Sequence, residues 1–419
     1  MDERDLAADA AARAEELARA AYGRLLAILA ASGGDIELAE DCLADAFAEA
    51  LESWPTSGVP RNPAAWLLTV ARNRRQDIAR SAAARRSDRL DDVAPGAAGD
   101  ALSVLEDIDP DAIPDRRLAL LFVCAHPAID PAVRTPLMLQ TVLGFEAVDI
   151  ARAFAVPATT MAQRLVRAKR RIRDARIPFV VPERDQMPAR LAPVLEAIYG
   201  AYAIDFPVVA GAQGRDDLAL EAYHLAATVA ELLPDDAEAL GLAALISLSL
   251  ARRPVGGASQ EFVPLEEQDT SRWDAELIAR GERYLERARA LSSIGRFQLE
   301  AAIQSVHCAR ATTGVIDWRA LQTLYAALLS VAPTLGARVA HAAAVARVDG
   351  AAAGLRLLEL DGSESMRRFQ PAWAARAHLL EEAGRLADAA VAYDRAISLT
   401  TDATSRRYLE RRRAQLQNV

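Results

Sequence analysis

The sequence predicts an all-α protein with two small helical domains followed by an array of helical repeats. Its 419 residues suggest about three domains, and hydrophobic residues make up 52% of them. Aromatic residues contribute only 5% and alanine is abundant, which favours helices that pack through small side chains. Lys169 is the only lysine among 49 basic residues, so the cationic sites are expected to be guanidinium sites.

Residues 35–51 are expected to form an amphipathic helix with a stripe of carboxylates. Apolar side chains recur on one face, whereas Asp41, Asp45, Glu49 and Glu52 follow at i, i+4, i+8 and i+11. Like charges at this spacing cost a helix roughly 0.2–0.5 kcal/mol per pair. We therefore expect a cationic partner for the stripe, and a solvated acidic face is the alternative.

The next segment, residues 61–90, is strongly basic, with eight arginines against two aspartates. A helix should start at Asn62, after the proline-rich loop of residues 54–60. Aromatic and basic side chains interleaved near a loop suit unstacked single-stranded bases and phosphates. A solvated arginine face is the alternative, and for Trp66 an anchor in the core is the favoured interpretation. The candidate nucleic-acid contacts are Asn62, Trp66, Arg72, Asn73, Arg74, Arg75, Arg80, Arg85 and Arg86.

An acidic connection follows. Between Asp91 and Asp115 there are eight carboxylates and no basic residue, and the content of proline, glycine and aspartate predicts a flexible linker over residues 91–114.

Residues 145–173 have the lengths and breaks of a helix-turn-helix, with the turn at residues 155–157. Met161, Leu165, Ala168 and Ile172 share one side of the second helix, which should face the core. Thr159 and Thr160 are expected to cap its first turn. Glutamine and arginine pair with base edges in a major groove. The candidate duplex contacts are Thr159, Thr160, Gln163, Arg164, Arg167 and Arg171.

In this order, the segments resemble the extracytoplasmic-function (ECF) sigma factors of bacterial RNA polymerase. Residues 39–47 (AEDCLADAF) are similar to the region that docks on the core enzyme, residues 65–74 (AWLLTVARNR) to the segment that melts and reads the minus-ten element, and residues 149–168 to the helix-turn-helix that reads the minus-thirty-five element. The resemblance implies RNA polymerase core enzyme and promoter DNA as partners. The docking residues that it implies are Asp41, Asp45, Phe47 and Glu49.

A narrower resemblance, carried by residues 124–129, 160–170, 177–179 and 267–274 (EQDTSRWD), is to the subgroup with a C-terminal extension of tetratricopeptide-like repeats. Residues 373–399 read as one such unit, and weaker units precede it. The expected domains are sigma region 2 (10–90), the linker (91–114), sigma region 4 (115–180) and the repeat extension (191–419). The extension is expected to bind a protein or peptide ligand and to regulate the sigma domains.

Other functions are disfavoured. The sequence has no phosphate-binding loop, nucleophile elbow or zinc motif, so no catalytic residue, metal or cofactor is expected. Cys42, Cys124 and Cys308 stand far apart and are expected to be buried free thiols. No apolar stretch is long enough to span a membrane, and a cytoplasmic location is expected. The alternatives are a DNA-binding regulator with a repeat scaffold that never contacts polymerase, and an adaptor whose basic patches are incidental.

Overall fold

The computed structural model of the protein describes residues 3–32, 34–87, 113–154, 156–183, 185–203, 212–253, 263–360, 363–400 and 402–416. Every regular element within these ranges is helical, which confirms the predicted fold class. The chain forms two compact units. The first comprises Met1–Asp205 and Asp216–Leu225, and the second comprises Phe206–Arg215 and Ala226–Val419. The predicted linker lies almost entirely outside the described residues.

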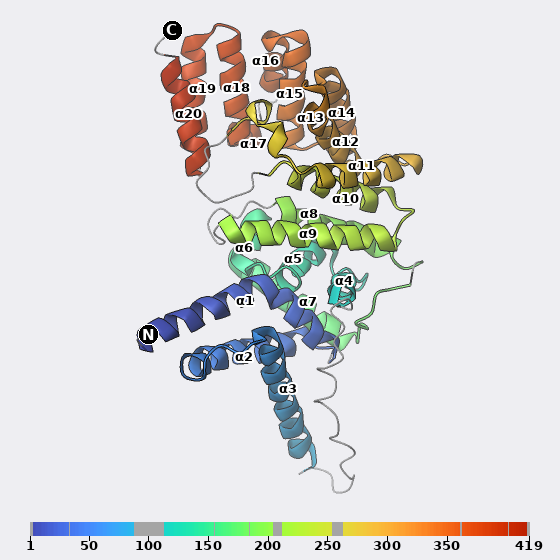
Figure 1. Cartoon of the computed structure of the whole chain (residues 1–419). Helices are drawn as coiled ribbons and strands as arrows, with labels where there is room; N and C mark the ends of the chain where they lie inside the picture. Colours follow the sequence, from blue (N-terminus) through green and yellow to red (C-terminus); the bar gives the residue numbers. More distant parts are fainter. Residues whose placement is uncertain are drawn as a thin grey trace. The chain divides into compact units, whose positions relative to one another are not determined.

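The first unit begins with three long helices, α1 (Glu3–Ala31), α2 (Ile36–Ser57) and α3 (Pro63–Ser87), in which α2 packs against both of its neighbours (Figure 1). Asp35 starts α2 by accepting a hydrogen bond from the backbone N–H of Leu38 at 3.1 Å. The buried side of α2 is the predicted apolar face, with Trp54 at its far end. This arrangement leaves the other side of α2 for the carboxylates.

Five more helices of the first unit follow, of which α5 packs against α4, α7 and α8. The predicted domain boundary at residue 191 falls inside α8, and α8 packs against α5 and α4, so the structure assigns the start of the predicted extension to the first unit. The bounds are α4 (Ile113–Cys124), α5 (Pro131–Thr141), α6 (Ala147–Ala153), α7 (Ala158–Asp174) and α8 (Pro188–Ala203), and α9 (Ala212–Leu232) contributes to both units.

The second unit is a succession of helices in which each packs mainly on its sequence neighbours, as α18 and α19 do (Figure 1). Gly384, with φ +72°, provides the left-handed residue that ends α18 before α19. The elements are α10 (Ala237–Leu250), the 3-10 turns η3 (Leu265–Glu267) and η4 (Thr270–Arg272), α11 (Ala275–Ala290), α12 (Arg296–Cys308), α13 (Arg310–Thr313), α14 (Trp318–Val331), α15 (Leu335–Asp349), α16 (Ala351–Leu360), α17 (Glu364–Arg367), α18 (Gln370–Glu382), α19 (Leu386–Leu399) and α20 (Ala403–Gln415).

Helices α10 and α12 approach closely because a glycine lies between them. A Cβ atom at Gly241 would come within 2.6 Å of the backbone nitrogen of Gln298. The carboxylate of Glu238, one turn earlier on α10, accepts hydrogen bonds from the backbone N–H groups of Phe297 at 3.0 Å and Gln298 at 3.1 Å. Glu238 therefore caps the start of α12 from a neighbouring helix.

Two apolar clusters hold the later helices of this unit together. One joins α15, α16, α18, α19 and α20 around Leu379, Leu380 and Tyr393, and the other joins α12, α14 and α15 around Ile303 and Leu321. Residues 373–399, predicted as a repeat unit, lie in α18 and α19, and the small residues Ala389 and Ala396 are fully buried.

All three cysteines are free and buried, as predicted. Burial raises the pKa of Cys124 to about 12 and that of Cys308 to about 11, so both thiols stay protonated and unreactive at neutral pH. In the part of the chain that the structure describes, no helix is both long enough and apolar enough to cross a membrane. Those same residues contain no group of three metal-binding side chains.

Candidate nucleic-acid interface of the first unit

The acidic stripe of α2 lies on the solvent side of the helix. Asp41, Asp45 and Glu49 are exposed, Phe47 is half-buried, and the intervening Cys42, Leu43 and Ala46 are completely buried. The helical spacing of these residues in the sequence thus places the apolar side chains on one side of α2 and the carboxylates on the other. The stripe is accessible to a large cationic partner.

One carboxylate of the stripe has a cation within the chain itself. Arg74 on α3 donates from Nε to Oδ2 of Asp45 at 2.7 Å, and this hydrogen bond raises the pKa of Arg74. A cationic partner was predicted for the stripe, and for Asp45 one such partner lies within the chain. The packing of α2 on α3 brings the basic segment beside the acidic one.

The residues predicted to contact the melted strand fall into two groups: some make contacts within the protein, and the others lie on the outer surface of α3. Asn62 caps the helix, since its Oδ1 accepts a hydrogen bond from the backbone N–H of Ala65 at 3.1 Å. Trp66 is half-buried and packs edge-on against Trp54, with ring centroids 5.5 Å apart. Arg75 is directed toward the end of α1, where it donates to the carbonyl oxygen of Leu29 at 2.9 Å. Asn62, Trp66 and Arg75 thus make contacts within the protein, besides being candidates for contact with the melted strand.

The remaining candidates of α3 lie on its outer surface. Asn73, Arg74 and Arg80 are exposed and Arg72 is half-buried. Arg80 forms an exposed ion pair with Asp77 at 3.2 Å. Arg85 and Arg86 belong to the last turns of α3, and their side chains lie outside the described residues. The structure therefore places several cations on the outer surface of α3, which we call the cationic ridge, and one of them, Arg74, lies beside the α2 stripe.

Helices α6 and α7 pack against each other across the predicted turn, and the apolar side of α7 is buried as predicted. The predicted capping role of the two threonines is wrong. Helix α7 begins at Ala158 after Pro157, no side chain caps it, and Thr159 and Thr160 already lie inside its first turn. Proline can precede a helix without a capping oxygen because its fixed φ already suits the extended entry.

The polar side of α7 faces away from its core contacts. Gln163, Arg167 and Arg171 are exposed, while Thr160 and Arg164 are half-buried. The Nε of Arg167 donates to the backbone carbonyl of Gln163 at 3.3 Å. The glutamine and arginine side chains thus stand on one accessible ridge of a helix of suitable length for a major groove.

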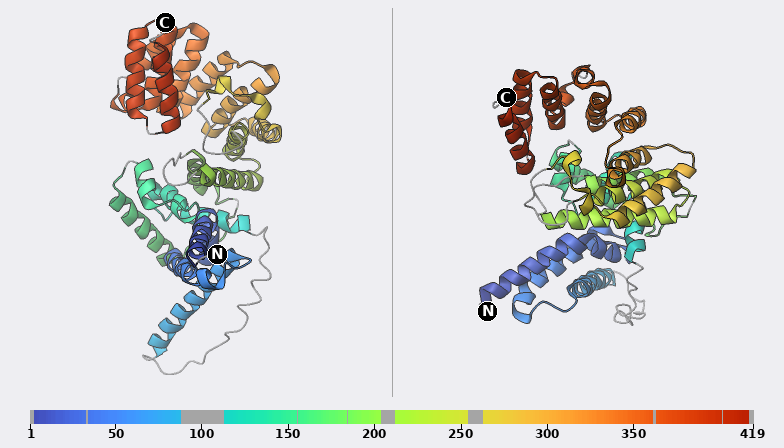
Figure 2. Two further views of the ribbon diagram at one scale, coloured as in Figure 1. Left: turned by 60° about the vertical axis from the view of Figure 1, so that its left-hand side comes forward. Right: turned by 45° about the horizontal axis from the view of Figure 1, so that its top comes forward.

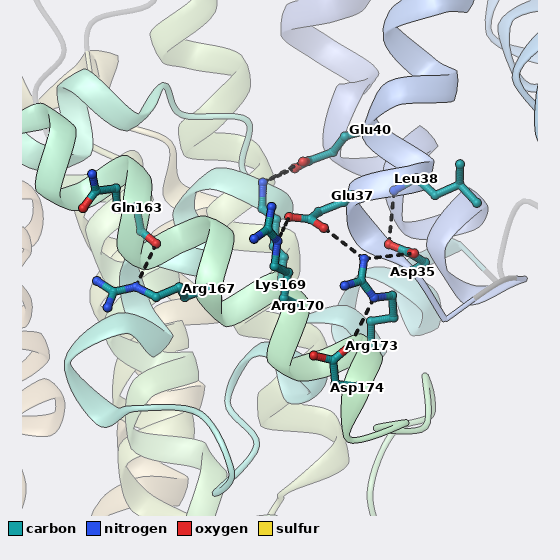
Figure 3. Close-up of polar contacts among 10 residues, drawn as sticks. All are labelled: Asp35, Glu37, Leu38, Glu40, Gln163, Arg167, Lys169, Arg170, Arg173 and Asp174. Atoms are coloured by element: carbon teal, nitrogen blue, oxygen red, sulfur yellow. Dashed lines mark hydrogen bonds and ion pairs between the residues drawn. The ribbon is translucent and has the colours of Figure 1, made fainter.

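A second, unexpected contact occupies the other half of the α7 cations. Lys169 lies 2.6 Å from both carboxylate oxygens of Glu40 on α2. Arg173 approaches Glu37 at 3.2 Å and Asp35 at 3.8 Å, and Arg170 approaches Glu37 at 3.5 Å. Figure 3 shows these cations directed toward the start of α2, with Gln163 and Arg167 farther along α7. We call this group of six residues the α2–α7 clasp.

Burial makes the central pair of the clasp unusual. The Lys169 side chain is 7% exposed and that of Glu40 is 21% exposed. Burial raises the pKa of Glu40, and the charge and hydrogen bond of Lys169 oppose that rise. Lys169 was not among the predicted DNA contacts, and its pairing with Glu40 was not predicted either. The one signal in the sequence is that it is the only lysine in a chain that otherwise uses arginine.

Comparisons with known proteins agree with this placement of the N-terminal helices. Residues 17–85, which cover most of α1 through α3, match Sigma-70 region 2. Residues 190–289 match a family of unknown function (DUF6596). The chain is 34% identical over 377 residues to an uncharacterized protein of Rhizobium meliloti (strain 1021), R00370, and the match covers 90% of this chain and 89% of that protein. No solved structure gave a significant match.

A relative of this identity that is matched over nearly its whole length establishes common membership, and the region 2 match supports a sigma factor. The chain belongs to the same family as R00370 of Rhizobium meliloti and carries a sigma-70 region 2 domain near its N-terminus.

Proposed function

We propose that the protein is a bacterial ECF sigma factor that binds core RNA polymerase and directs promoter recognition, with a C-terminal helical-repeat domain that regulates it. The observation that carries the proposal is the juxtaposition of an exposed carboxylate stripe on α2 with an exposed arginine ridge on α3, inside a segment that matches Sigma-70 region 2. An acidic docking surface and a cationic strand-binding surface must lie side by side if one domain is to hold polymerase and melted DNA together.

In this proposal α2 contacts the core enzyme. Asp41, Asp45 and Glu49 face basic side chains of polymerase, and the half-buried Phe47 packs at the edge of the contact. Complementary charge steers such an encounter and selects the partner. The cytoplasm, where polymerase works, is the corresponding location.

The exposed residues of α3 bind the melted DNA strand in this proposal. Asn73, Arg74 and Arg80 would neutralise phosphates, and each phosphate contact contributes to affinity through counterion release. Trp66 packs edge-on against the buried Trp54, so in this proposal its ring anchors α3 on α2 rather than binding a base directly.

The α6–α7 pair acts as the helix-turn-helix for the minus-thirty-five element. Gln163 and Arg167 stand on its accessible ridge, and Arg164 and Arg171 flank them. A bidentate contact from glutamine or arginine to a base discriminates by roughly 1–3 kcal/mol. The clasp uses Lys169, Arg170 and Arg173, so these cations are not available to DNA in the described arrangement.

Reconstitution with core RNA polymerase tests the proposal. Run-off transcription from a randomised promoter library should yield a defined class of promoters when the protein is present. Asp41→Arg together with Glu49→Arg should abolish polymerase binding, whereas Glu183→Arg together with Asp185→Arg, an equal charge change on two exposed residues outside α2, should not. If no promoter supports transcription in the presence of the wild-type protein, it is not a sigma factor.

The same variants distinguish the sigma factor from a DNA-binding regulator. A regulator that never contacts polymerase would keep full activity in Asp41→Arg/Glu49→Arg and lose it in Gln163→Ala. Gln186→Ala is the matched control, because this exposed glutamine lies outside α7. An adaptor with incidental basic patches would retain no DNA even at low salt.

The regulatory role of the C-terminal part needs a truncation that respects the first unit. Helix α8 packs on α5, and residues 216–225 of α9 also belong to the first unit, so the shortened chain should end after Leu232. Promoter output from this chain, with circular dichroism to verify its helices, is expected to differ strongly from that of the full chain. Equal output would remove the regulatory part of the proposal.

A further inference from the structure

The second unit contains a segment that behaves as a bound peptide. Residues 263–274, which we call the strap, include η3 and η4, and no residue of either turn is buried. In the right-hand view of Figure 2 the helices from α12 to α20 form an arc, and the yellow strap lies on its inner side. Helical-repeat proteins use this concave side to bind other chains.

One arginine of the arc holds the acidic side chain of the strap. Arg347 on α15 approaches both carboxylate oxygens of Glu266, at 2.7 and 2.6 Å. The same guanidinium stands 5.3 Å from the ring centroid of Trp318 and 3.4 Å from Glu382. Ring stacking and a second carboxylate hold the guanidinium in place, so its Nη2 group is positioned to donate to both oxygens of a carboxylate.

A second arginine donates hydrogen bonds to the backbone of the strap. Arg310 on α13 donates to the carbonyl oxygens of Leu265 and Gln268, which are the two ends of the 3-10 turn. Its guanidinium stacks on Trp273 at 5.3 Å from the centroid, and Arg252 stacks on the same ring at 5.9 Å. Carbonyl contacts of this kind recognise a turn of any sequence, whereas Arg347 selects the acidic residue inside it.

The strap fills this site imperfectly. Glu266 remains 42% exposed, and the Oε1 atom of Gln268 is buried without a hydrogen-bond partner. Exposed ion pairs add little stability, and an unsatisfied buried acceptor subtracts from it. Trp273 anchors one end of the strap, whereas within the described residues the turn at Leu265–Glu267 is held by side-chain contacts from Arg310 and Arg347.

We propose that Arg310 and Arg347 form a receptor for a short acidic turn of a partner protein, and that the strap is its resident occupant, displaced when the partner binds. The ligand is a peptide of the type Leu-Glu-Glu in a single 3-10 turn, whose carboxylate binds Arg347 and whose carbonyl oxygens bind Arg310. The receptor lies in the helical repeats and involves no contact with polymerase or DNA. Neither is present in the binding test, so a negative result would leave the proposed sigma function unaffected.

The test uses the full chain and a fluorescent peptide with the sequence of residues 263–269 (VPLEEQD), acetylated and amidated at its ends. In the wild-type chain the tethered strap competes at a high effective concentration, so the peptide should bind weakly. Glu266→Gln loosens the strap and should raise peptide affinity by up to about fivefold, the most that loss of an exposed ion pair supplies. Adding Arg347→Gln to Glu266→Gln should abolish that gain.

Two matched variants control for charge. Glu276→Gln removes an exposed carboxylate of α11 that pairs with Arg280, and Arg413→Gln removes an exposed arginine of α20 that pairs with Asp394. Neither should change peptide affinity. A peptide in which both glutamates are glutamine should fail to bind every variant.

Hydrogen exchange measured by mass spectrometry supplies an independent readout. Amides of residues 265–273 should exchange faster when the acidic peptide is bound, because the strap has left its site. The proposal is overturned if Glu266→Gln gives no gain in affinity, if the neutral peptide binds as well as the acidic one, or if the peptide binds while strap exchange stays unchanged. In each case the strap is a structural tie between the helices.

Discussion

Arg74 and Asp45, 29 residues apart in sequence, are joined by a 2.7 Å hydrogen bond between Nε of the arginine and Oδ2 of the carboxylate. The pair links the acidic stripe of α2 to the cationic ridge of α3. Both side chains are about half exposed, at 55% and 53%. Polymerase and DNA would therefore each compete with this internal contact for one of its members.

The first prediction concerns that competition. Asp45→Asn should raise the affinity of the free protein for single-stranded DNA by less than about tenfold, because DNA no longer has to displace an exposed ion pair, which contributes little, to reach Arg74. Glu49→Gln removes the same charge one turn farther along α2 and is the control. Fluorescence anisotropy at two salt concentrations measures both. An equal rise in the two variants would show a general charge effect instead of a specific pair.

The second prediction concerns the α2–α7 clasp. Lys169→Met should lower the local unfolding free energy of α2 and α7 by about 2–4 kcal/mol, because it leaves the largely buried Glu40 carboxylate without its cation. The double variant Lys169→Met/Glu40→Leu should recover most of this loss, since apolar side chains can replace a buried ion pair. Hydrogen exchange of peptides from α2 and α7 gives the measurement.

Arg170→Met is the control for the clasp, because the Arg170 side chain is 60% exposed and its contact with Glu37 is long, at 3.5 Å. This variant should change the local stability by less than about 1 kcal/mol. If Lys169→Met is equally mild, the clasp does not hold the two helices together.

The third prediction is a pH dependence of the second unit. Burial, with the nearby charges of Arg252 and Arg310, lowers the pKa of His307 from 6.5 to about 4. The unfolded chain therefore binds more protons between these values, so the free energy of unfolding should fall by about 3 kcal/mol as the pH drops from 6.5 to 4. Stability above pH 6.5 should not depend on this group.

Thermal denaturation across this pH range, compared between the wild-type protein and His307→Gln, isolates the contribution. The variant should have a flatter profile, even if it is less stable at neutral pH. His378→Gln alters an exposed histidine of α18 and should keep the wild-type slope. Parallel profiles for the wild-type protein and His307→Gln would contradict the prediction.

The fourth prediction concerns the approach of α10 to α12. Gly241→Ala should destabilise the second unit by roughly 1–3 kcal/mol, because the new Cβ meets the backbone of residues 297 and 298 rather than a side chain that could rotate away. Gly336→Ala, in the first turn of α15, has no atom within 4 Å of the new Cβ and should be neutral or slightly stabilising. Urea unfolding compares the two, and equal effects would refute the prediction.

Periodic features were the ones that the sequence predicted well. The buried side of α7, the apolar side of α2 and the exposure of Asp41 and Glu49 all follow from a helical repeat that places neighbours one turn apart on the same face. The predicted start of α7 after residue 157 agrees with the structure, but the capping role of the threonines was wrong, because both already lie within the first turn. Boundaries depend on a few local contacts, whereas faces depend on many residues.

Long-range pairs could not be predicted. Nothing in the sequence connects Lys169 with Glu40 or Arg347 with Glu266, which are separated by 129 and 81 residues. Arginine-rich stretches were interpreted as nucleic-acid surfaces, and half of the α7 cations instead hold carboxylates of α2. The neighbours of a charged residue in the sequence do not show whether its side chain will face solvent, DNA or another helix.

The helical fold, the places of the acidic and basic segments and the apolar sides of α2 and α7 could be predicted from the chain alone, because they depend on the spacing of residues within one helix. The pairing of charges, the exposure of the remaining ones and the contact of the strap with the arginines of the arc follow from how the helices pack in three dimensions. Those outcomes depend on distances between elements that are far apart in the chain. Packing of the apolar faces sets these distances, and the charged side chains then pair with whatever that packing brings near.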